Sequence, residues 1–251
     1  MDPHLTCDAF LGGQLNVWQP ISGYRAGVDP VFLAASVPAV SGQSVLELGC
    51  GVGVASLCLA KRVPELRLTG LELQPEYADL ARRNAQENSV NLNIIDGDLA
   101  DMPPALKQVT FDHVIANPPY FRRDRSSPAT DAGRETAMGE VRELEAWVKV
   151  AAKRLAPKGY ASFIHRAERL GDLLAALDGR LGSVQVLPLV PRQGRDARLA
   201  LVRARKGGKA ALRLHDSVYL HTGAQHESDQ DDYTPRISGV LRNGDALAFP
   251  E

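Results

Sequence analysis

Short apolar runs and longer amphipathic stretches alternate along most of this chain. The runs have the length of strands and end at glycine, asparagine or acidic residues, while the stretches between them have the spacing of helices. Strands that alternate with helices predict an α/β fold, with a parallel sheet covered by helices on both faces. Strands are predicted at residues 44–48, 66–72, 91–95, 111–116, 160–165, 184–190 and 198–202, the last two as a hairpin.

The predicted helices are recognised by their first residues. Asp29 followed by Pro30 is typical of an N-cap and a first-turn proline, and the apolar stretch to Val37 completes a short helix. Capping is the main interpretation of Asp29, and a cofactor contact is the alternative. Further helices are predicted from Gly53 to Ala60, from Pro75 toward Asn88, and over residues 140–156 and 168–178.

Three regions are predicted from these elements. Residues 1–40 form an N-terminal appendage with the first helix, residues 41–210 form the core, and residues 211–251 form a C-terminal extension packed on the core as a short strand and a helix. Residues 122–139 are rich in Arg, Ser, Pro, Thr, Asp and Gly and show no periodicity. A loop of that length is a candidate lid or target clamp, with a plain surface segment as the alternative.

The first core strand runs directly into a glycine-rich loop, with glycines at 49, 51 and 53. Glycines let the backbone turn tightly and approach a ligand closely, and the following helix N-terminus offers unpaired N–H groups. The spacing is G-x-G-x-G and differs from the G-x-G-x-x-G of nicotinamide and flavin sites. The alternative is a tight strand-to-helix turn that binds nothing.

Carboxylates stand at the ends of successive strands. Glu72 lies roughly twenty residues past the glycines, where the ribose-binding acid of a nucleoside site is expected. Asp98 can accept a hydrogen bond from an adenine amino group, with the backbone N–H of Leu99 offered to the ring. Glu47 is placed to meet an ammonium group. Each acid alone is explained equally well as a helix cap or a solvated loop residue, but their order favours a nucleoside site.

The tetrapeptide Asn117-Pro118-Pro119-Tyr120 follows the strand at 111–116. An exocyclic amine conjugated to a ring is a poor nucleophile, because its lone pair is delocalised. The Asn117 oxygen and the Pro118 carbonyl can each accept one of its hydrogens and so expose that lone pair. Proline has a fixed φ and no competing N–H, and Tyr120 supplies a flat face for a base. The alternative is an ordinary turn.

In this order, residues 44–120 resemble the class I methyltransferases that use S-adenosylmethionine. The resemblance implies a Rossmann-like, mostly parallel sheet of seven strands in which the last-inserted strand is antiparallel. It also implies a reaction without a metal and without a covalent intermediate. The implied cofactor residues are Glu47, Gly49, Gly51, Gly53, Glu72, Leu73, Asp98, Leu99 and Asn117. The implied catalytic residues are Asn117, Pro118 and Tyr120.

A second resemblance covers nearly the whole chain. It rests on residues 19–30, on Asn117–Phe121, on His165-Arg166, on Pro191-Arg192 and on Lys206-Gly207-Gly208. These segments are similar to the bacterial family that methylates N6 of an adenine in valine tRNA, next to the anticodon. The resemblance implies an S-adenosylmethionine-dependent N6-adenine methyltransferase with RNA, and specifically tRNA, as its partner.

Other acceptors remain open. The same loop serves enzymes that methylate a protein glutamine amide, but those usually carry a separate helical recognition domain, and only residues 1–43 precede the first predicted core strand. Guanine N2 and DNA adenine are chemically possible too. A non-enzymatic RNA-binding protein on a retired methyltransferase fold is the alternative of a different class, and it predicts a damaged cofactor site.

Charge does not identify the partner by itself. The 251 residues carry a formal net charge of −1, so an RNA enzyme needs a local basic patch, because phosphate neutralisation drives affinity. One arginine cluster follows the catalytic loop and another runs from Arg192 to Lys209. A solvated face is the alternative for both clusters. The residues expected to contact substrate are Arg25, Arg122, Arg123, Arg192, Arg195 and Arg198.

The remaining composition favours a soluble cytoplasmic protein. Three cysteines without a C-x-x-C pair indicate a reducing compartment. The opening residues lack the pattern of a signal peptide, and no apolar run reaches the length of a membrane span. His215, His221 and His226 lie in the tail near several acids, but their spacing matches no zinc pattern, so no metal is expected.

Overall fold

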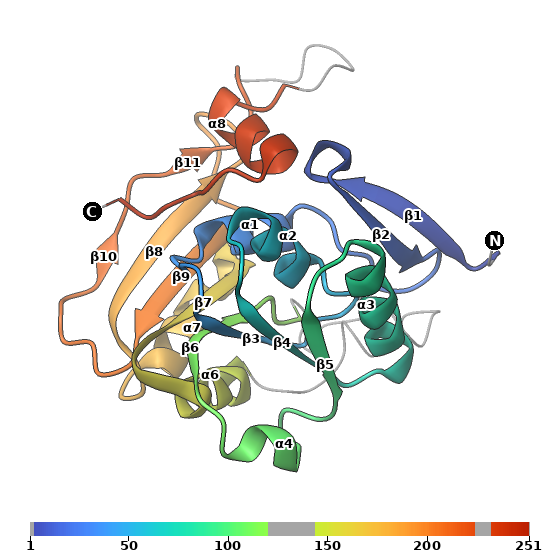
Figure 1. Ribbon diagram of the computed structural model, residues 1–251. Helices are drawn as coiled ribbons and strands as arrows, with labels where there is room; N and C mark the ends of the chain where they lie inside the picture. The colour runs from blue at the N-terminus through green and yellow to red at the C-terminus, as the bar shows by residue number, and fades with distance from the viewer. Residues whose placement is uncertain (1–2, 120–143, 224–231, 251) are drawn as a thin grey trace.

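The computed structural model describes residues 3–119, 144–223 and 232–250, and its centre is one large sheet (Figure 1). Seven strands have the order β8-β9-β7-β6-β3-β4-β5, and β9 is antiparallel to both of its neighbours. The predicted fold is therefore confirmed, including the antiparallel last strand. These strands are β3 (Ser44–Leu48), β4 (Arg67–Glu72), β5 (Leu92–Asp96), β6 (Phe111–Ala116), β7 (Leu155–Arg166), β8 (Gly182–Val190) and β9 (Leu199–Arg205).

Helices cover both faces of the sheet, and two apolar cores result. One core joins the sheet to the first three helices, and the second joins its other face to the later ones. Strand residues alternate between these cores, as Val45 and Leu46 do, because successive side chains of a strand point to opposite faces. The helices are α1 (Asp29–Ser36), α2 (Val54–Arg62) and α3 (Pro75–Glu87) on one face, and α4 (Pro104–Lys107), α6 (Leu144–Arg154) and α7 (Leu170–Leu177) on the other.

The predicted cap of the first helix is wrong. The helix begins at Asp29 itself, with Val28 in the N-cap position and no side-chain capping bond. Val28 has helical backbone angles of φ −82° and ψ −20°, whereas a side-chain cap requires an extended residue at that position. Pro30 does lie in the first turn, as predicted.

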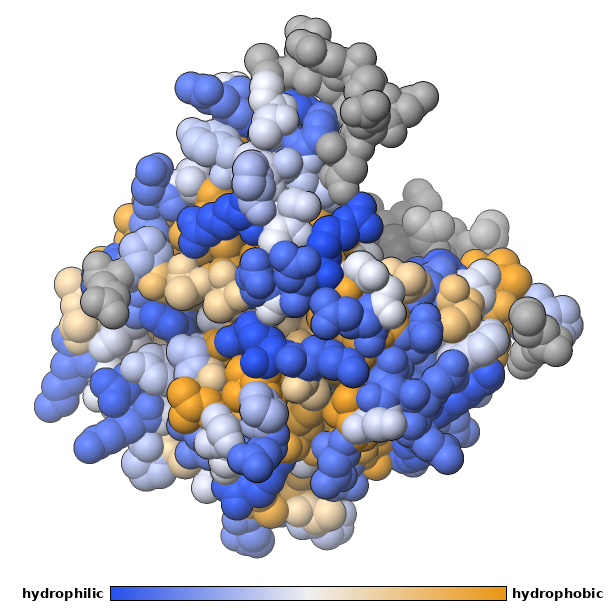
Figure 2. Space-filling model, turned by 45° about the horizontal axis from the view of Figure 1, so that its top comes forward, coloured by the Kyte–Doolittle hydropathy of each residue, from blue (hydrophilic) through white to orange (hydrophobic). Residues whose placement is uncertain are grey.

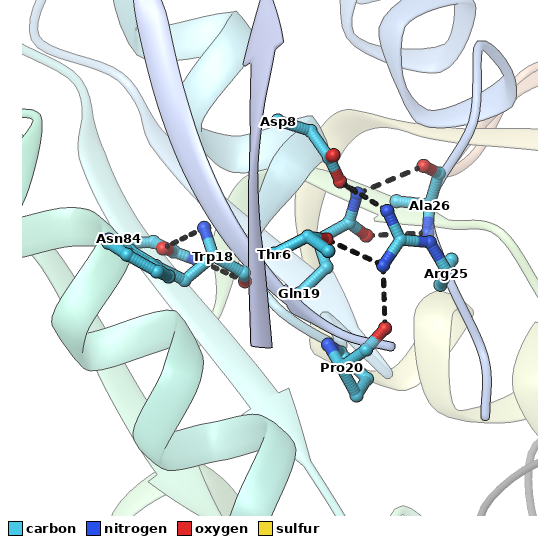
Figure 3. Close-up of polar contacts among 8 residues, drawn as sticks. All are labelled: Thr6, Asp8, Trp18, Gln19, Pro20, Arg25, Ala26 and Asn84. Carbon is cyan, nitrogen blue, oxygen red and sulfur yellow. Dashed lines mark hydrogen bonds and ion pairs between the residues drawn. The ribbon is translucent and has the colours of Figure 1, made fainter. Parts of the chain in front are cut away.

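The N-terminal appendage contains a hairpin that the sequence pattern had not revealed. Strands β1 (Leu5–Phe10) and β2 (Leu15–Pro20) pair antiparallel around the short turn η1 (Leu11–Gly13). The fully buried Asn84 of α3 holds this hairpin, since it accepts a bond from the Trp18 amide at 2.8 Å and donates to the Trp18 carbonyl at 3.1 Å (Figure 3). The side-chain amide of Asn84 also donates to the carbonyl of Val52 at 3.0 Å. Asn84 thereby links the hairpin to the glycine loop.

The C-terminal extension adds to the outer edge of the sheet and to the first core. Strands β10 (Arg213–Leu214) and β11 (Val218–Tyr219) both pair parallel with β8. The helical segments α8 (Pro235–Ser238) and η3 (Gly239–Asn243) follow, and Leu247 donates from its amide to the Ala35 carbonyl at 2.8 Å. The expected strand and helix are both present, and a second short strand accompanies them.

The outer surface is mostly hydrophilic on the face drawn in Figure 2, with smaller apolar areas between the polar side chains. Among the described residues, three of the exposed large apolar side chains belong to the loop between β2 and α1: Ile21, Tyr24 and Val28. This loop carries part of the sequence motif at residues 19–30, and its Tyr24 lies beside the glycine loop.

Candidate active site

The carboxyl ends of three neighbouring strands bring the predicted site together. Strand β3 pairs in parallel with β4 on one side and with β6 on the other, so that Leu48 lies opposite both Leu71 and Ala116. The residues that follow these strands therefore share one edge of the sheet. They are the glycine loop, the turn after Glu72 and the loop that begins at Asn117. Ligands of open α/β sheets bind at this edge.

The glycine loop has a backbone that only glycine adopts without strain. Gly49, Gly51 and Gly53 have φ values of +60°, +54° and +90°. A Cβ at Gly49 would stand 2.5 Å from the ring of Trp147, whereas the nearest atom to a Cβ at Gly51 is 3.9 Å away, in the ring of Tyr24. The backbone at Gly51 thus borders open space on the side of Tyr24, which suits the close approach of a ligand.

Glu72 at the end of β4 directs its carboxylate into this loop. Its Oε2 accepts a hydrogen bond from the Gly51 amide at 2.7 Å, and its Oε1 accepts bonds from the amides of Leu73 and Gln74 at 2.9 and 3.0 Å. Burial raises the pKa of Glu72, and the three amides oppose that rise. The side chain occupies the expected position for a ribose-binding acid, and that role stays a prediction.

Glu47 lies in β3, two residues before Gly49, and is almost completely buried. Its Oε2 accepts bonds from the amide and the hydroxyl of Ser56 at 3.0 and 2.5 Å. Burial raises the pKa of Glu47 to about 7, against the lowering effect of the Ser56 bonds. A buried carboxyl that titrates near neutrality is poised to ionise when a cation arrives. This property fits the ammonium group of S-adenosylmethionine.

Asp98 and Leu99 stand beside Glu72 because the chain turns back after β5. The Gly97 amide donates to the Glu72 carbonyl at 2.8 Å, and Asp98 accepts a bond from the Ala100 amide at 2.5 Å. Leu99 is buried in the second core. The turn therefore lies beside the end of β4 that carries Glu72, and its expected contact with an adenine base stays a prediction.

Asn117 presents an acceptor that nothing in the described part of the chain uses. Its Nδ2 donates to the hydroxyl of Tyr24 at 3.4 Å, and its Oδ1 is buried without a hydrogen-bond partner among the described residues. Buried polar atoms of this kind are rare and are commonly completed by a ligand or water. Pro118 and Pro119 follow directly, and Tyr120 lies outside the described residues.

Tyr24 is a site residue that the sequence reasoning did not select. Its backbone donates from the amide to the hydroxyl of Tyr77 at 2.9 Å, and the Tyr77 hydroxyl donates to the Tyr24 carbonyl at 3.2 Å. Although the Tyr24 side chain as a whole is partly exposed, desolvation of its hydroxyl, together with the nearby carboxylates of Asp29 and Glu47, raises the pKa of Tyr24 well above its usual value, so the hydroxyl stays neutral. The only sequence signal for Tyr24 was its place in the motif at residues 19–30.

Arg25 fastens the same loop to the hairpin. Its guanidinium donates to Asp8 at 2.6 Å and to Thr6 and the Pro20 carbonyl at 2.7 Å each (Figure 3). The neighbouring Ala26 amide donates to the side chain of Gln19 at 2.8 Å. These bonds give Arg25 a structural role, and its expected contact with substrate stays a prediction.

The later arginine cluster is divided between the two ends of the sheet. Arg195 and Arg198 are exposed in the turn from β8 to β9, and the Ala167 amide donates to the Arg198 carbonyl at 2.9 Å, which places them at the carboxyl end of β7. Arg192 is bound to Asp232 and to the Thr222 carbonyl. Lys206 and Lys209 follow the last residue of β9 and lie toward the opposite end, because β9 runs antiparallel, while Arg203 lies within the sheet opposite Ser162. Arg122, Arg123 and the loop 122–139 lie outside the described residues.

The tail histidines are occupied by other contacts where the structure describes them. His221 bonds to Asp232 at 2.6 Å and stacks on Tyr233, and His215 bonds to Gln185 at 3.0 Å. His226 is outside the described residues. Within residues 3–119, 144–223 and 232–250, no group of three or more His, Cys, Asp or Glu side chains could hold a metal ion. No helix in these ranges has the length and apolar character to cross a membrane.

Comparison with known proteins adds a family and several relatives. Residues 28–187 match the model of the methyltransferase small domain. The chain is 32% identical over 200 residues to a tRNA1(Val) (adenine(37)-N6)-methyltransferase of Porphyromonas gingivalis, covering 72% of this chain and 76% of the relative. It is 30% identical over 200 residues to the protein of that name from Actinobacillus succinogenes, with 78% and 82% covered.

Solved structures share the fold. A predicted O-methyltransferase from Agrobacterium tumefaciens has a TM-score of 0.70 and 27% identity, with 88% of this chain and 99% of that chain covered. The 16S rRNA N2 G1207 methyltransferase of Thermus thermophilus, in complex with AdoMet and guanosine, has a TM-score of 0.55 and 20% identity, with 80% and 50% covered. At that identity the second likeness supports the fold alone.

Proposed function

This chain belongs to the methyltransferase small domain family, and we propose that it transfers a methyl group to N6 of an adenine in RNA, specifically in a tRNA near the anticodon. It is an S-adenosylmethionine-dependent N-methyltransferase, as the resemblance had implied. The choice of adenine in tRNA is supported by the names of the relatives from Porphyromonas gingivalis and Actinobacillus succinogenes.

The unpaired Oδ1 of Asn117 is the observation that carries the proposal. An acceptor buried without a partner is costly unless a ligand completes it. An exocyclic amine supplies two N–H donors. One donates to Asn117 and the other to the Pro118 carbonyl, and the lone pair of the nitrogen is then free to point between them.

S-adenosylmethionine, when bound, supplies a methyl group attached to a positively charged sulfur. Glu47 would face its ammonium group, Glu72 its ribose hydroxyls, and Asp98 with Leu99 its adenine. Gly51 leaves room beside the loop for that approach. Alignment of the amine with the methyl group is then the main task of the site, and positioning of this kind accounts for large rate effects.

A hydroxyl acceptor fits the described site less well. The Agrobacterium protein is titled a predicted O-methyltransferase, and transfer to oxygen generally needs a base that removes the hydroxyl proton. Near Asn117, Tyr24 has a raised pKa, and His165 has a pKa lowered to about 4 with its Nδ1 occupied by the Arg166 amide. Neither group is placed to act as a base, whereas an amine needs none before transfer.

RNA contact is assigned to the arginines at the active-site end of the sheet. Arg198 directly precedes β9. Strand β9 is two strands away from β6 in the sheet, so at ordinary strand spacing the two strands are roughly 10 Å apart. Arg195 lies in the same turn, and both side chains are exposed. Cations at this distance can hold the phosphates that flank a target nucleotide. An adenine in a loop is also cheaper to extract than one in a duplex.

The test is methyl transfer from radiolabelled S-adenosylmethionine to separated pools of tRNA, rRNA, DNA and protein, followed by mapping of the labelled nucleotide. Label at N6 of an adenine in tRNA is the expected result. Label in a protein amide, in DNA or at guanine N2 would replace the proposed acceptor. No label in any pool, together with no cofactor binding by calorimetry, would favour the retired fold.

A further inference from the structure

We propose that His165 is a positioning residue that fixes the backbone of the catalytic loop through the carbonyl of Pro119. The proposal rests on the proposed function of that loop, and it adds a residue from a strand that carries none of the other site groups. His165 does not touch the reacting atoms in this assignment. It acts through Pro119 on the neighbouring Pro118 carbonyl.

The position of His165 follows from strand pairing. In the parallel pair β6 and β7, Ala116 lies opposite Phe163, so the residues just beyond each partner lie side by side as well. His165 is 1% exposed, and its Nδ1 accepts a bond from the Arg166 amide at 2.9 Å. The ring is also hydrogen-bonded to the Pro119 backbone. Because Nδ1 is an acceptor, the proton of the neutral ring is on Nε2, which donates to the Pro119 carbonyl.

The bond from His165 to the Pro119 carbonyl holds a backbone segment that has no N–H groups of its own. Pro118 and Pro119 have no backbone N–H, so carbonyl oxygens are the only backbone groups by which the loop can be held. Proline fixes φ but leaves ψ to be set by surrounding contacts. A donor on the Pro119 carbonyl restricts ψ at Pro119 and removes a competing acceptor. The Pro118 carbonyl is then left to receive the substrate amine.

The surroundings of His165 keep its ring neutral. Burial, with a smaller effect from the positive charges of Arg169 and Arg166, lowers the pKa of His165 to about 4, although the bond to Pro119 and the charge of Asp172 act in the opposite direction. The ring therefore carries a single proton throughout the neutral range, and the blocked Nδ1 cannot serve as a base. A fixed tautomer with one donor suits positioning.

Two variants separate the hydrogen bond from simple filling of space. His165→Leu fills a similar volume without a donor, and His165→Gln retains a donor at similar reach. For the full-length protein and the tRNA that it methylates, we expect His165→Leu to lower kcat roughly 10- to 100-fold, because small misplacements of reacting groups have effects of this size. KM for S-adenosylmethionine and for tRNA should change less than about twofold, and His165→Gln should recover kcat to within about fivefold of wild type.

Thermal unfolding of both variants shows whether the fold is retained. Wild-type kcat in a folded His165→Leu would overturn the proposal. So would an equal loss of kcat in both variants, because the donor would then not matter. A parallel rise of KM for cofactor and tRNA would indicate general damage to the site and would also contradict it.

NMR of the protein without substrate supplies a second readout that does not depend on methyl transfer. We expect a slowly exchanging Nε2 proton on His165 and a Pro119 carbonyl resonance that shifts in His165→Leu but stays near the wild-type position in His165→Gln. If the wild type methylates no nucleic acid, the proposed function is wrong. The NMR experiment still shows in that case whether His165 donates to the Pro119 carbonyl. A rapidly exchanging Nε2 proton, or a Pro119 resonance unchanged in His165→Leu, would overturn the inference.

Discussion

The side-chain amide of Asn117 donates from Nδ2 to the hydroxyl of Tyr24 over 3.4 Å, across 93 positions of the sequence. In this arrangement Nδ2 is turned toward Tyr24, and Oδ1 is left as a buried acceptor without a partner among the described residues. A flipped amide would present donors to a substrate that itself donates. The contact with Tyr24 thereby holds Asn117 in an orientation that leaves Oδ1 to accept from an amine.

Substitution of Asn117 tests the acceptor directly. We expect Asn117→Ala to lower kcat about 100-fold or more, since loss of one preorganised hydrogen-bonding group in a buried site has an effect of this size. The dissociation constant for S-adenosylmethionine, measured by calorimetry, should stay within about threefold of wild type. Transfer at the wild-type rate would show that Asn117 is not catalytic.

Tyr24→Phe removes only the hydroxyl that orients Asn117. The contact is one neutral hydrogen bond, so kcat should fall roughly 2- to 10-fold with little change in either KM. Tyr219→Phe, at an exposed position in β11, is the matched control and should have no effect. An equal change in the two variants would remove Tyr24 from the site.

The two ends of the sheet should differ in their contribution to tRNA binding. Arg195→Ala with Arg198→Ala should raise KM for tRNA about tenfold, reduce the dependence of log affinity on log salt by about 2, and leave kcat nearly unchanged. Lys209→Ala with Arg213→Ala removes the same charge from exposed positions away from the active-site end, since Lys209 follows β9 and Arg213 lies on the edge strand β10. Steady-state kinetics at several salt concentrations should show less than a twofold change for this control. Equal effects would indicate attraction by net charge alone.

Arg25 has two possible roles that a double-mutant cycle can separate. If its bond to Asp8 serves mainly to hold the loop, Arg25→Ala and Asp8→Ala should lower the unfolding temperature similarly, and the double variant should be little worse than either single variant. If Arg25 also contacts RNA, only Arg25→Ala should raise KM for tRNA. Thermal unfolding and tRNA kinetics on the three variants give both answers.

Cofactor affinity should depend on pH through Glu47. Its pKa of about 7 means that the free protein carries a proton there at pH 6, and an ammonium group beside it would displace that proton. We expect S-adenosylmethionine to bind more tightly as pH rises from about 6 to about 7.5, below the range in which its own amino group loses charge. Calorimetry in buffers of different ionisation enthalpy should detect proton release, and Glu47→Gln should abolish it.

The same carboxyl affects the stability of the protein without cofactor. Its pKa is raised from 4.5 to about 7 on folding, so between these values the folded protein holds a proton that the unfolded chain has lost. Its contribution to stability is full below about pH 4.5 and is lost as pH rises through about 7. Glu47→Gln should therefore increase stability at pH 8, by at most about 3 kcal/mol. Urea unfolding at pH 5 and pH 8 tests this, and an equal change at both values would contradict it.

The local units of this protein and their order along the chain can be predicted from the amino-acid sequence alone. Strand-length runs ending at Gly49, Glu72 and Asn117 predicted a parallel sheet with a nucleoside site. Each strand and the loop after it are defined by residues that are neighbours in the chain. The loops come together because the carboxyl ends of parallel strands meet at one edge of the sheet. The insertion of β9 beside β7 was predicted only through the family resemblance. The first cap was misplaced, since the backbone at Val28 is already helical.

The distant groups that complete the site become apparent once the chain is folded. The hairpin at residues 5–20 is held by Asn84, Tyr24 reaches Asn117, and His165 reaches Pro119. The later arginines are divided between the two ends of the sheet by the reversed direction of β9. Periodicity describes which face of an element is apolar, but it carries no information on the register between strands or on the partner of a polar side chain. Those contacts are fixed by packing between segments far apart in the chain.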